Sequence, residues 1–329
     1  MEYRKLGHTD IDVSVIALGC WPFAGGVVWG EQDDEVSIAT VHAALDAGIN
    51  FFDTAEGYED GHSERVLGRG LLGRRREAVI ATKVSASNLA PADLVEACER
   101  SLQNLQTDYV DLYQIHWPNH EIPLAETVGA LTRLKEQGKI RAIGVSNFGV
   151  GDLSDLLTLT TCATNQIPYS LLWRVIEQEI KPLCQANGVG IICYSPLAQG
   201  LLTGRYASAD EVPDGLARTR HYAGTRPLAK HGELGCEAEV FAALAAVRKI
   251  AVKLGASMAA VSLAWVRQQP GVTSYLTGAR TPEEVRMNLP SLDLTLSGDA
   301  IAALSAATEE VKAKLGTNPD PWMSPSRYR

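Results

Sequence analysis

Residues 140–167, IRAIGVSNFGVGDLSDLLTLTTCATNQI, contain the pattern that decides the fold. A short apolar run at 140–145 is followed by a polar turn, a segment with helical periodicity at 151–159, and a second apolar run at 163–167. Short β-branched runs bounded by turn residues indicate strands, and apolar residues three and four positions apart indicate an amphipathic helix. Two strands joined through a helix predict a parallel pair, because a parallel crossover needs a connection of this length.

The same unit of strand and helix recurs along the chain, about eight times in all, which predicts a parallel α/β protein. The other predicted strands are residues 13–18, 49–52, 78–82, 109–115, 190–194 and 273–276. The other predicted helices are residues 34–47, 63–72, 91–105, 124–137, 175–187, 237–254 with 257–268, and 281–288. Strands that are apolar almost throughout favour a closed (β/α)8 TIM barrel, in which helices cover the whole sheet.

We expect residues 1–329 to form one TIM-barrel domain with an N-terminal β-hairpin, a long loop after strand seven and an extra C-terminal helix at 298–311. The alternative is an open doubly wound sheet. Its glycine fingerprint occurs at 68–73, but there it follows a helix and precedes a strand, which is the reverse of the required order. We interpret these glycines as helix termination, assign Ser63 as a helix N-cap, and expect Gly138 and Gly188 to end helices.

Composition narrows the functional classes. The net charge of −9 and the pI of about 5.3 argue against general binding to nucleic acid or anionic membranes. No segment reads as a signal peptide or a membrane span, so we expect a cytoplasmic location. The six cysteines are widely separated and form no C-x-x-C pair, which indicates reduced, buried thiols. A small-molecule enzyme fits best, and the sequence leaves monomer and homo-oligomer both open.

Two segments are expected to cover the mouth of the barrel. Residues 195–232 follow the seventh strand with little periodicity, and a structureless connection of this length is usually functional, so we interpret it as a lid. An ordinary surface loop is the alternative. We expect the proline-rich tail at 321–329 to pack over the same mouth.

Polar residues stand where the predicted strands end, which is where barrel enzymes carry their active sites. Asp53, Lys83 and His116 end the second, third and fourth strands, and Tyr58 lies in the loop after Asp53. A buried lysine needs a charged partner, and Asp53 is the nearest candidate. A phenol beside that ammonium is expected to have a pKa below about 10, which would make Tyr58 an acid and base near neutral pH. A structural salt bridge beside a buried tyrosine is the alternative interpretation.

Several stretches resemble the aldo-keto reductase superfamily, near its branch of channel beta subunits, over almost the whole chain. They are residues 50–58 (NFFDTAEGY), 81–84 (ATKV), 114–118 (QIHWP), 144–148 (GVSNF), 165–166 (NQ), 194–201 (YSPLAQGL) and 278–288. The resemblance implies an NAD(P)H-dependent reductase of aldehydes, ketones or sugar-like carbonyls, of the alcohol dehydrogenase and carbonyl reductase type. Asp53, Tyr58, Lys83 and His116 match the catalytic tetrad of the family, with Tyr58 as the general acid.

The resemblance also implies a cofactor site. The residues that match it are Trp21, Ser146, Asn147, Gln166, Tyr194, Ser195, Pro196, Leu197, Gln199, Gly200, Leu201, Gly278, Arg280, Glu284 and Asn288. Ser146, Asn147 and Gln166 would hold the nicotinamide carboxamide, and Tyr194 would stack on its ring. Arg280 suits the 2′-phosphate of NADPH. Glu284 suits a ribose hydroxyl better, so NADH is possible, and Asn288 either contacts adenine or caps a helix.

The expected substrate contacts are Trp21, Trp29, Tyr58, His116 and Trp117, with Phe23 in the same group of mouth loops. Aromatic walls are common in ligand pockets, although each ring alone could be ordinary packing. Two other functions remain open: a nicotinamide-binding regulatory module like the channel beta subunits, and a Schiff-base aldolase acting through Lys83. We expect no metal site, because nothing near His120 completes a ligand set of recognised spacing.

Overall fold

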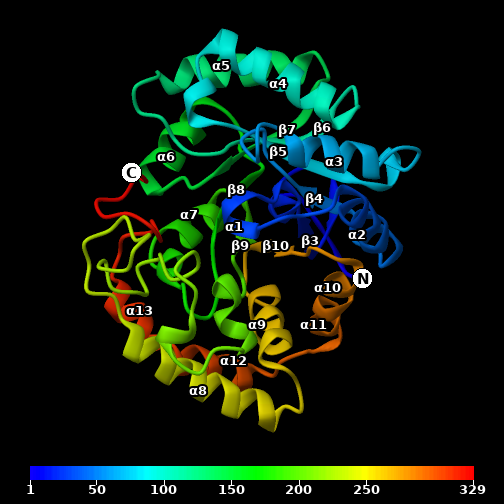
Figure 1. Ribbon diagram of the computed structural model, residues 1–329. Helices are drawn as coiled ribbons and strands as arrows, with labels where there is room; N and C mark the ends of the chain where they lie inside the picture. The colour runs from blue at the N-terminus through cyan, green and yellow to red at the C-terminus, as the bar shows by residue number, and fades with distance from the viewer.

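The computed structural model, which describes residues 1–26 and 29–329, contains a closed barrel of eight parallel strands surrounded by helices (Figure 1). Its strands are β3 (Ile16–Gly19), β4 (Phe51–Asp53), β5 (Val79–Val84), β6 (Val110–Ile115), β7 (Ile140–Ser146), β8 (Thr164–Pro168), β9 (Gly190–Tyr194) and β10 (Val272–Gly278). Strand order follows the chain, and β10 closes the barrel against β3. The predicted TIM barrel is therefore confirmed.

The helices form the outer ring. They are α1 (Gly26–Trp29), α2 (Asp34–Asp46), α3 (His62–Gly70), α4 (Pro91–Leu105), α5 (Leu124–Glu136), α6 (Val150–Leu159), α7 (Ile180–Ala186), α8 (Glu237–Lys253), α9 (Met258–Arg267), α10 (Pro282–Asn288), α11 (Pro290–Asp293), α12 (Gly298–Ala307) and α13 (Glu309–Leu315). The predicted stops at Gly138 and Gly188 are confirmed, because both glycines have positive φ angles just past α5 and α7.

A hairpin of β1 (Tyr3–Lys5) and β2 (Asp12–Ser14) lies at the amino-terminal end of the barrel. Leu6, Ile11 and Val13 are buried together with the residues that fill the barrel interior. The predicted single strand at 13–18 is divided at Val15, whose N–H donates to Glu2 in the hairpin and whose carbonyl accepts from β10. The two halves of this apolar run therefore belong to different sheets.

Three other element predictions need correction. Helix α3 begins at His62 after Gly61, and Ser63 is not its N-cap, because the Ser63 hydroxyl donates to the Cys20 carbonyl. The helix predicted at 175–187 is a 3-10 turn followed by α7, since Pro182 has no N–H to extend the helix backwards. The helix predicted at 298–311 breaks at buried Thr308 and then continues to Leu315.

The long connection at 195–232 contains two 3-10 turns, Ala198–Thr203 and Ala209–Glu211, and is otherwise irregular. Part of it is firmly packed. Arg220 is buried, pairs with Glu233 and donates to the carbonyls of Leu315 and Asn318, so it fixes the root of the C-terminal tail. The lid function of this segment stays a prediction.

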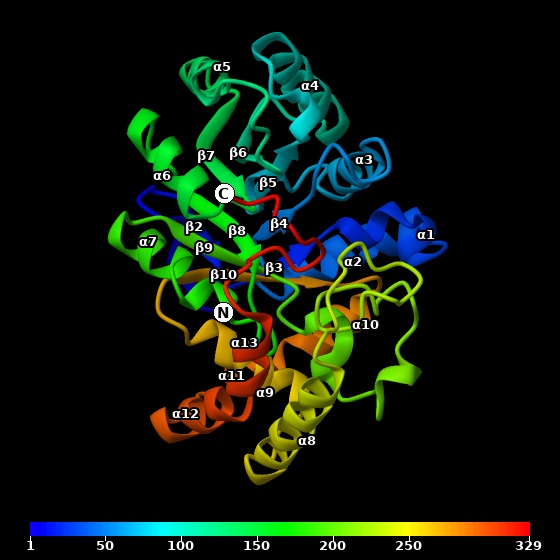
Figure 2. The same ribbon diagram turned by 90° about the vertical axis from the view of Figure 1, so that its left-hand side faces the viewer.

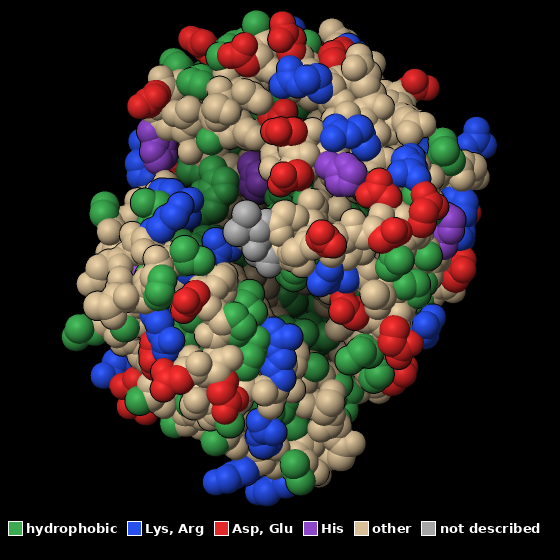
Figure 3. All heavy atoms as spheres, in the orientation of Figure 1, with side chains coloured by type: hydrophobic (Ala, Val, Ile, Leu, Met, Phe, Trp, Pro, Cys, Tyr) green, Lys and Arg blue, Asp and Glu red, His purple; other side chains and the backbone are tan. Residues whose placement is uncertain are grey.

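The C-terminal tail passes from α13 toward the carboxyl ends of β7 and β8 (Figure 2). The face seen in Figure 1 is hollowed near its centre, and hydrophobic side chains are visible in the hollow (Figure 3). Within the described residues, no single helix has the length and apolar character of a membrane span; the pair α8 and α9 reaches them only jointly, across a 93° bend.

Candidate active site

The four residues predicted to carry the chemistry meet at the carboxyl end of the barrel. The Lys83 ammonium donates to Asp53 Oδ1 at 2.6 Å, to the Thr54 carbonyl at 2.8 Å and to the Tyr58 phenol oxygen at 3.1 Å. Lys83 and Asp53 are buried on β5 and β4, which pair directly in the sheet. His116 follows β6, and its ring meets Tyr58 edge-on with centroids 5.8 Å apart.

The charges of this cluster differ from the expectation in one respect. Burial alone would lower the pKa of Lys83, but the Asp53 carboxylate and the Tyr58 oxygen outweigh it and leave the lysine pKa raised. Burial raises the pKa of Tyr58, and the opposing effect of Lys83 does not overcome it. The expectation of a lowered Tyr58 pKa was therefore wrong, because desolvation of the phenolate exceeds its attraction to the ammonium.

His116 is neutral in this environment. Its burial, followed by the nearby Lys83 charge, lowers its pKa to about 3. A neutral imidazole keeps one N–H to donate. The cluster thus places the protonated Tyr58 phenol next to the Lys83 ammonium and the neutral His116 imidazole.

Asp53 has a second set of partners that the sequence reasoning did not assign. Its Oδ2 accepts from Gln166 Nε2 at 2.7 Å and from Gln114 Nε2 at 3.3 Å, and both amides are buried. Gln114 lies on β6 two residues before His116. Because side chains alternate between the two faces of a strand, Gln114 and His116 both lie on the inner face of the barrel. This alternation is the sequence signal from which a role for Gln114 in the site could have been predicted.

The predicted carboxamide-binding residues lie together at the ends of β7, β8 and β9. Ser146 Oγ donates to the Gln166 carbonyl, and Asn147 Nδ2 donates to Ser146 Oγ and to the His116 carbonyl. The Tyr194 phenol donates to Asn147 Oδ1 at 2.8 Å. Asn147 has a φ of 61°, a left-handed conformation that is uncommon outside glycine and concentrates at functional sites.

The C-terminal tail reaches the same residues. The Tyr328 phenol is buried and donates to Asn147 Oδ1 at 2.6 Å. The Trp322 ring lies parallel to Tyr194, with centroids 5.9 Å apart. The Arg327 guanidinium lies 3.6 Å from the centre of the Trp117 ring. The expected position of the tail over the mouth is thus confirmed.

The aromatic residues predicted to wall the substrate site divide into two groups. Trp21 stacks on Tyr58 with centroids 6.0 Å apart and so lies beside the tetrad, and Trp29 meets Trp21 edge-on. Trp117 instead contacts the tail. Phe23 lies in the 3-10 turn after β3, as predicted, but its side chain is fully buried in the main core, which assigns it to packing and not to the substrate wall.

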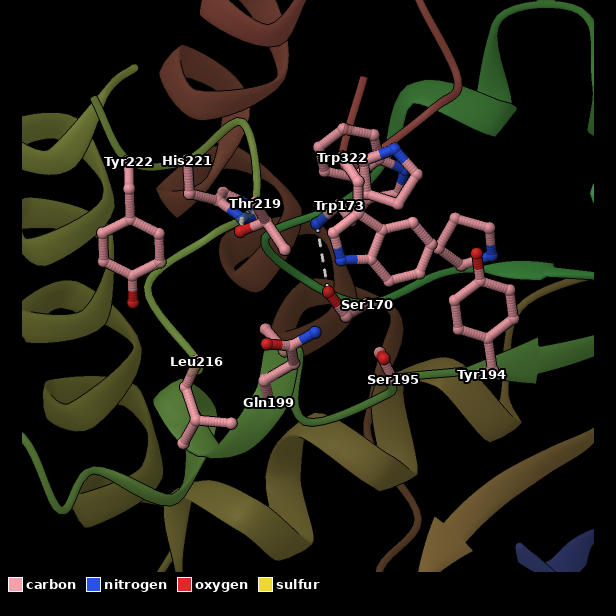
Figure 4. A pocket seen from close by; sticks show the side chains of 13 residues that line it. Ser170, Trp173, Tyr194, Ser195, Gln199, Leu216, Thr219, His221, Tyr222 and Trp322 are labelled. Atoms are coloured by element: carbon pink, nitrogen blue, oxygen red, sulfur yellow. Dashed lines mark hydrogen bonds between the residues drawn. The ribbon is translucent and has the colours of Figure 1, made fainter. Parts of the chain in front are cut away.

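The loop after β9 holds the predicted cofactor residues Ser195, Pro196, Leu197, Gln199, Gly200 and Leu201. Ser195, Gln199 and Gly200 have positive φ angles, so the loop turns sharply over the barrel end. Leu201 is buried, which assigns its side chain to packing. A cavity of about 30 Å³ lies between Ser195 and Gln199 on one side and Trp322 on the other (Figure 4).

The residues predicted for the adenosine end follow β10. Arg280 donates from Nε to Gln32 Oε1 at 2.8 Å, and Gln32 Nε2 donates back to the Arg280 carbonyl at 2.9 Å. Glu284 accepts from the Arg280 N–H at 2.7 Å. Asn288 donates to the Glu284 carbonyl, in agreement with the helix-capping alternative. Gly278 ends β10, and a Cβ there would lie 3.2 Å from the Pro22 side chain.

His120 lies outside this cluster. Its Nε2 hydrogen-bonds to Asp152 at 2.8 Å beside a separate cavity of about 260 Å³. In the described part of the chain, no group of three or more His, Cys, Asp and Glu side chains has an arrangement that could hold a metal ion.

Three curated relatives match nearly the full chain. Aldo-keto reductase YhdN of Bacillus subtilis is 35% identical and covers 87% of each chain. The NADH-specific methylglyoxal reductase of Escherichia coli is 36% identical over 92% of this chain and 97% of its own. A probable voltage-gated potassium channel beta subunit of Oryza sativa is 31% identical over 89% and 92%.

Two solved structures are also similar to this chain over most of its length. A glycerol dehydrogenase from Gluconobacter oxydans superposes with a TM-score of 0.81 at 33% identity, covering 96% of each chain. An aldo/keto reductase from Klebsiella pneumoniae in complex with NADP and acetate gives a TM-score of 0.72 at 32% identity, over 90% of this chain and 91% of that one. The sequence profile of the Aldo/keto reductase family matches residues 15–309. This chain therefore belongs to the aldo/keto reductase family.

Proposed function

We propose that this protein reduces aldehydes and ketones to alcohols with a nicotinamide cofactor, preferring NADPH, and that Tyr58 donates the proton. The observation that carries the proposal is the buried contact of Lys83 with both Asp53 and Tyr58, beside a neutral His116. The methylglyoxal reductase among the relatives and the NADP complex among the structures support this reaction class.

The residues fit a nicotinamide dinucleotide by their chemistry. A carboxamide needs both donors and acceptors, which the hydroxyl of Ser146 and the side-chain amides of Asn147 and Gln166 provide. A pyridinium ring needs a flat aromatic face, which Tyr194 provides. The guanidinium of Arg280 suits a phosphate dianion. When bound, the nicotinamide supplies the hydride for the substrate carbon.

The protein would supply the proton and the orientation. The Tyr58 O–H donates its proton to the carbonyl oxygen, and its raised pKa keeps that proton in place at neutral pH. The neutral imidazole of His116 donates an N–H to the same oxygen and orients the carbonyl. Lys83 stabilises the phenolate that remains, and Asp53 holds Lys83 charged and in position.

The choice between NADPH and NADH depends on Arg280. Its contacts with Gln32 and Glu31 hold the guanidinium in place without using a carboxylate, so its charge is available for a phosphate. The Glu284 side chain is occupied by the Arg280 N–H, which supports NADPH over a ribose contact from this carboxylate. NADH remains the alternative cofactor, as in the relative named NADH-specific.

The test is the Tyr58→Phe variant, with Tyr3→Phe as a matched control at the opposite end of the barrel. Reduction of methylglyoxal and 4-nitrobenzaldehyde should fall by about 10²–10⁴-fold in Tyr58→Phe, the usual contribution of a general acid, while NADPH binding persists. Tyr3→Phe should keep full activity, because its exposed side chain donates to the Gly48 carbonyl and takes no part in the tetrad. Full activity of Tyr58→Phe would refute the mechanism.

A regulatory module with little catalysis is the second candidate, and the channel beta subunit among the relatives supports it. It predicts nicotinamide binding with no more than a few turnovers of any carbonyl in a broad panel of aldehydes, ketones and sugars. Multiple turnover of any member of that panel would favour the reductase.

A further inference from the structure

The C-terminal tail uses up the hydrogen-bonding capacity of Asn147. Its Oδ1 accepts from the phenols of Tyr194 and Tyr328, and its Nδ2 donates to Ser146 and to the His116 carbonyl. A carbonyl oxygen has two lone pairs and an amide nitrogen has two hydrogens, so this side chain has no capacity left. A bound carboxamide can reach Asn147 only if an existing hydrogen bond breaks.

The tail also restricts the space beside the proposed cofactor residues. Tyr194, Ser195 and Gln199 face Pro321 and Trp322 across a cavity of about 30 Å³ (Figure 4). The cavity has room for a few waters. Ser146, Asn147 and Gln166 do not line it, and the tail reaches these residues through the Tyr328 phenol.

Polar atoms around this cavity are poorly satisfied in the docked arrangement. The indole nitrogens of Trp322 and Trp173, the Gln199 Oε1 and the Tyr222 hydroxyl are buried without a hydrogen-bond partner among the described residues. Buried unpaired polar atoms destabilise an arrangement. Of these atoms, only the Trp322 nitrogen belongs to the tail, so this indole is held beside Tyr194 by ring contact and not by a hydrogen bond to a described residue.

The tail is held together by contacts within itself and is anchored at both ends. The Asp320 carboxylate is buried and accepts from the backbone of Trp322, Met323 and Arg327 and from the Arg327 guanidinium, so the segment has its own internal framework. Arg220 fixes its root. Its far end is held by Arg329, whose backbone N–H donates to the Asp152 carboxylate at 2.8 Å, whose carbonyl accepts from the Asp152 N–H at 3.1 Å, and whose guanidinium pairs with Asp152 and Asp155. Only the Arg329–Asp155 pair is exposed on both sides and therefore weak, whereas Asp152 is buried, so the Asp152 carboxylate is the main side-chain anchor of the tail end.

We propose that residues 320–329 form a displaceable plug, which occupies the nicotinamide position in the free protein and must leave before the cofactor is seated. This inference rests on the proposed function, because it assigns the carboxamide to Asn147. It predicts that the nicotinamide half of the cofactor competes with the tail, whereas the adenosine half binds independently of it.

The first test is hydrogen exchange of the wild-type protein, measured by mass spectrometry with and without saturating NADPH. Binding normally slows exchange, and the loop at 195–204 should follow that rule. Backbone amides of residues 322–329 should instead exchange several times faster with NADPH, but should not change with 2′,5′-ADP, which lacks the nicotinamide. Slower or unchanged exchange of the tail with NADPH would overturn the proposal.

The second test is the Tyr328→Phe variant, which keeps the ring and frees one lone pair of Asn147. Its NADPH Kd should fall about fivefold, corresponding to one neutral hydrogen bond, while its 2′,5′-ADP Kd stays unchanged. Asp152→Asn, which weakens the anchor of the tail away from the cofactor residues, should also lower the NADPH Kd. Tyr3→Phe serves as the control and should change neither constant.

The outcomes separate the two hypotheses. Unchanged or weaker NADPH binding by both tail variants, with normal binding by the wild type, would refute the plug and leave the proposed reductase intact. Absence of NADPH and NADH binding in the wild type and in both variants would contradict the proposed function, and the plug with it.

Discussion

The two ends of the barrel are each covered by a terminal segment, and the two segments use different chemistry. At the amino end, the hairpin buries Leu6, Ile11 and Val13 against the barrel interior. Gly7 approaches the backbone so closely that a Cβ would lie 2.0 Å from the Ala163 carbonyl oxygen. At the carboxyl end, the tail is held by a phenol, a stacked indole and arginine contacts, and much of it is partly exposed.

Because of this difference, we expect the hairpin to affect the stability of the fold and the C-terminal tail to affect cofactor binding. Apolar closure contributes in proportion to the area removed from water, and no soluble ligand can replace it. Polar closure can be exchanged, because a cofactor can offer Asn147 and Tyr194 equivalent partners. Changes at the hairpin should therefore alter folding without altering cofactor binding, and changes at the mouth should do the reverse.

The largest expected effect is at the hairpin. Leu6→Ala should lower the free energy of unfolding by about 2–5 kcal/mol, because it leaves a cavity at a fully buried site. Denaturant unfolding measures this loss, and the NADPH Kd at low temperature should stay within twofold of wild type. Leu234→Ala is the control, since Leu234 is 94% exposed. A loss below about 1 kcal/mol would show that the hairpin is not part of the core.

The second-largest expected effect is the pH dependence of the reaction rate, which reports the protonation of Tyr58. Burial raises the pKa of Tyr58, so the phenol stays protonated at neutral pH and carbonyl reduction under saturating conditions should be flat from about pH 6 to 9. The reverse reaction needs the phenolate. Its rate should rise about tenfold per pH unit below the Tyr58 pKa. An alcohol oxidation rate that levels off near pH 7 would show that Lys83 overcomes burial after all.

The adenosine end should show a smaller effect. Arg280→Ala should weaken NADPH binding by about 10–100-fold, as expected for a charge-assisted contact, and NADH binding by less than about twofold. Arg286→Ala is the matched control, because Arg286 lies on the same helix α10 but is exposed and pairs with Glu283. Equal losses for NADPH and NADH in Arg280→Ala would refute the phosphate contact.

Glu284→Gln should produce the smallest change. The substitution removes a negative charge next to the proposed phosphate site but keeps an acceptor for the Arg280 N–H. NADPH binding should tighten by about two- to fivefold, the usual range for a screened charge near the surface. Isothermal titration with both cofactors measures this change, and tighter NADH binding of the same size would contradict it.

The catalytic tetrad was predictable because its signal is local. Asp53, Lys83 and His116 each end an apolar strand run, and parallel strands bring their carboxyl ends to one place. The division of residues 13–18 was not predictable, since the hairpin and the barrel both require apolar residues. Gln114 was missed although its spacing from His116 places it on the inner face of the barrel, because that spacing does not identify Asp53 as its partner.

Hydrophobic periodicity and strand-end positions are properties of the local chain, and they were enough to predict the barrel, the order of its strands and the three residues that end strand runs, with Tyr58 in the loop after one of them. The pKa direction of Tyr58 could not be read from the sequence, because it depends on how deeply the phenol is buried in the folded protein. Only the tertiary structure brought Tyr328 to Asn147, across 181 positions of the chain. Both results depend on packing between distant segments, which the pattern of a single segment cannot specify.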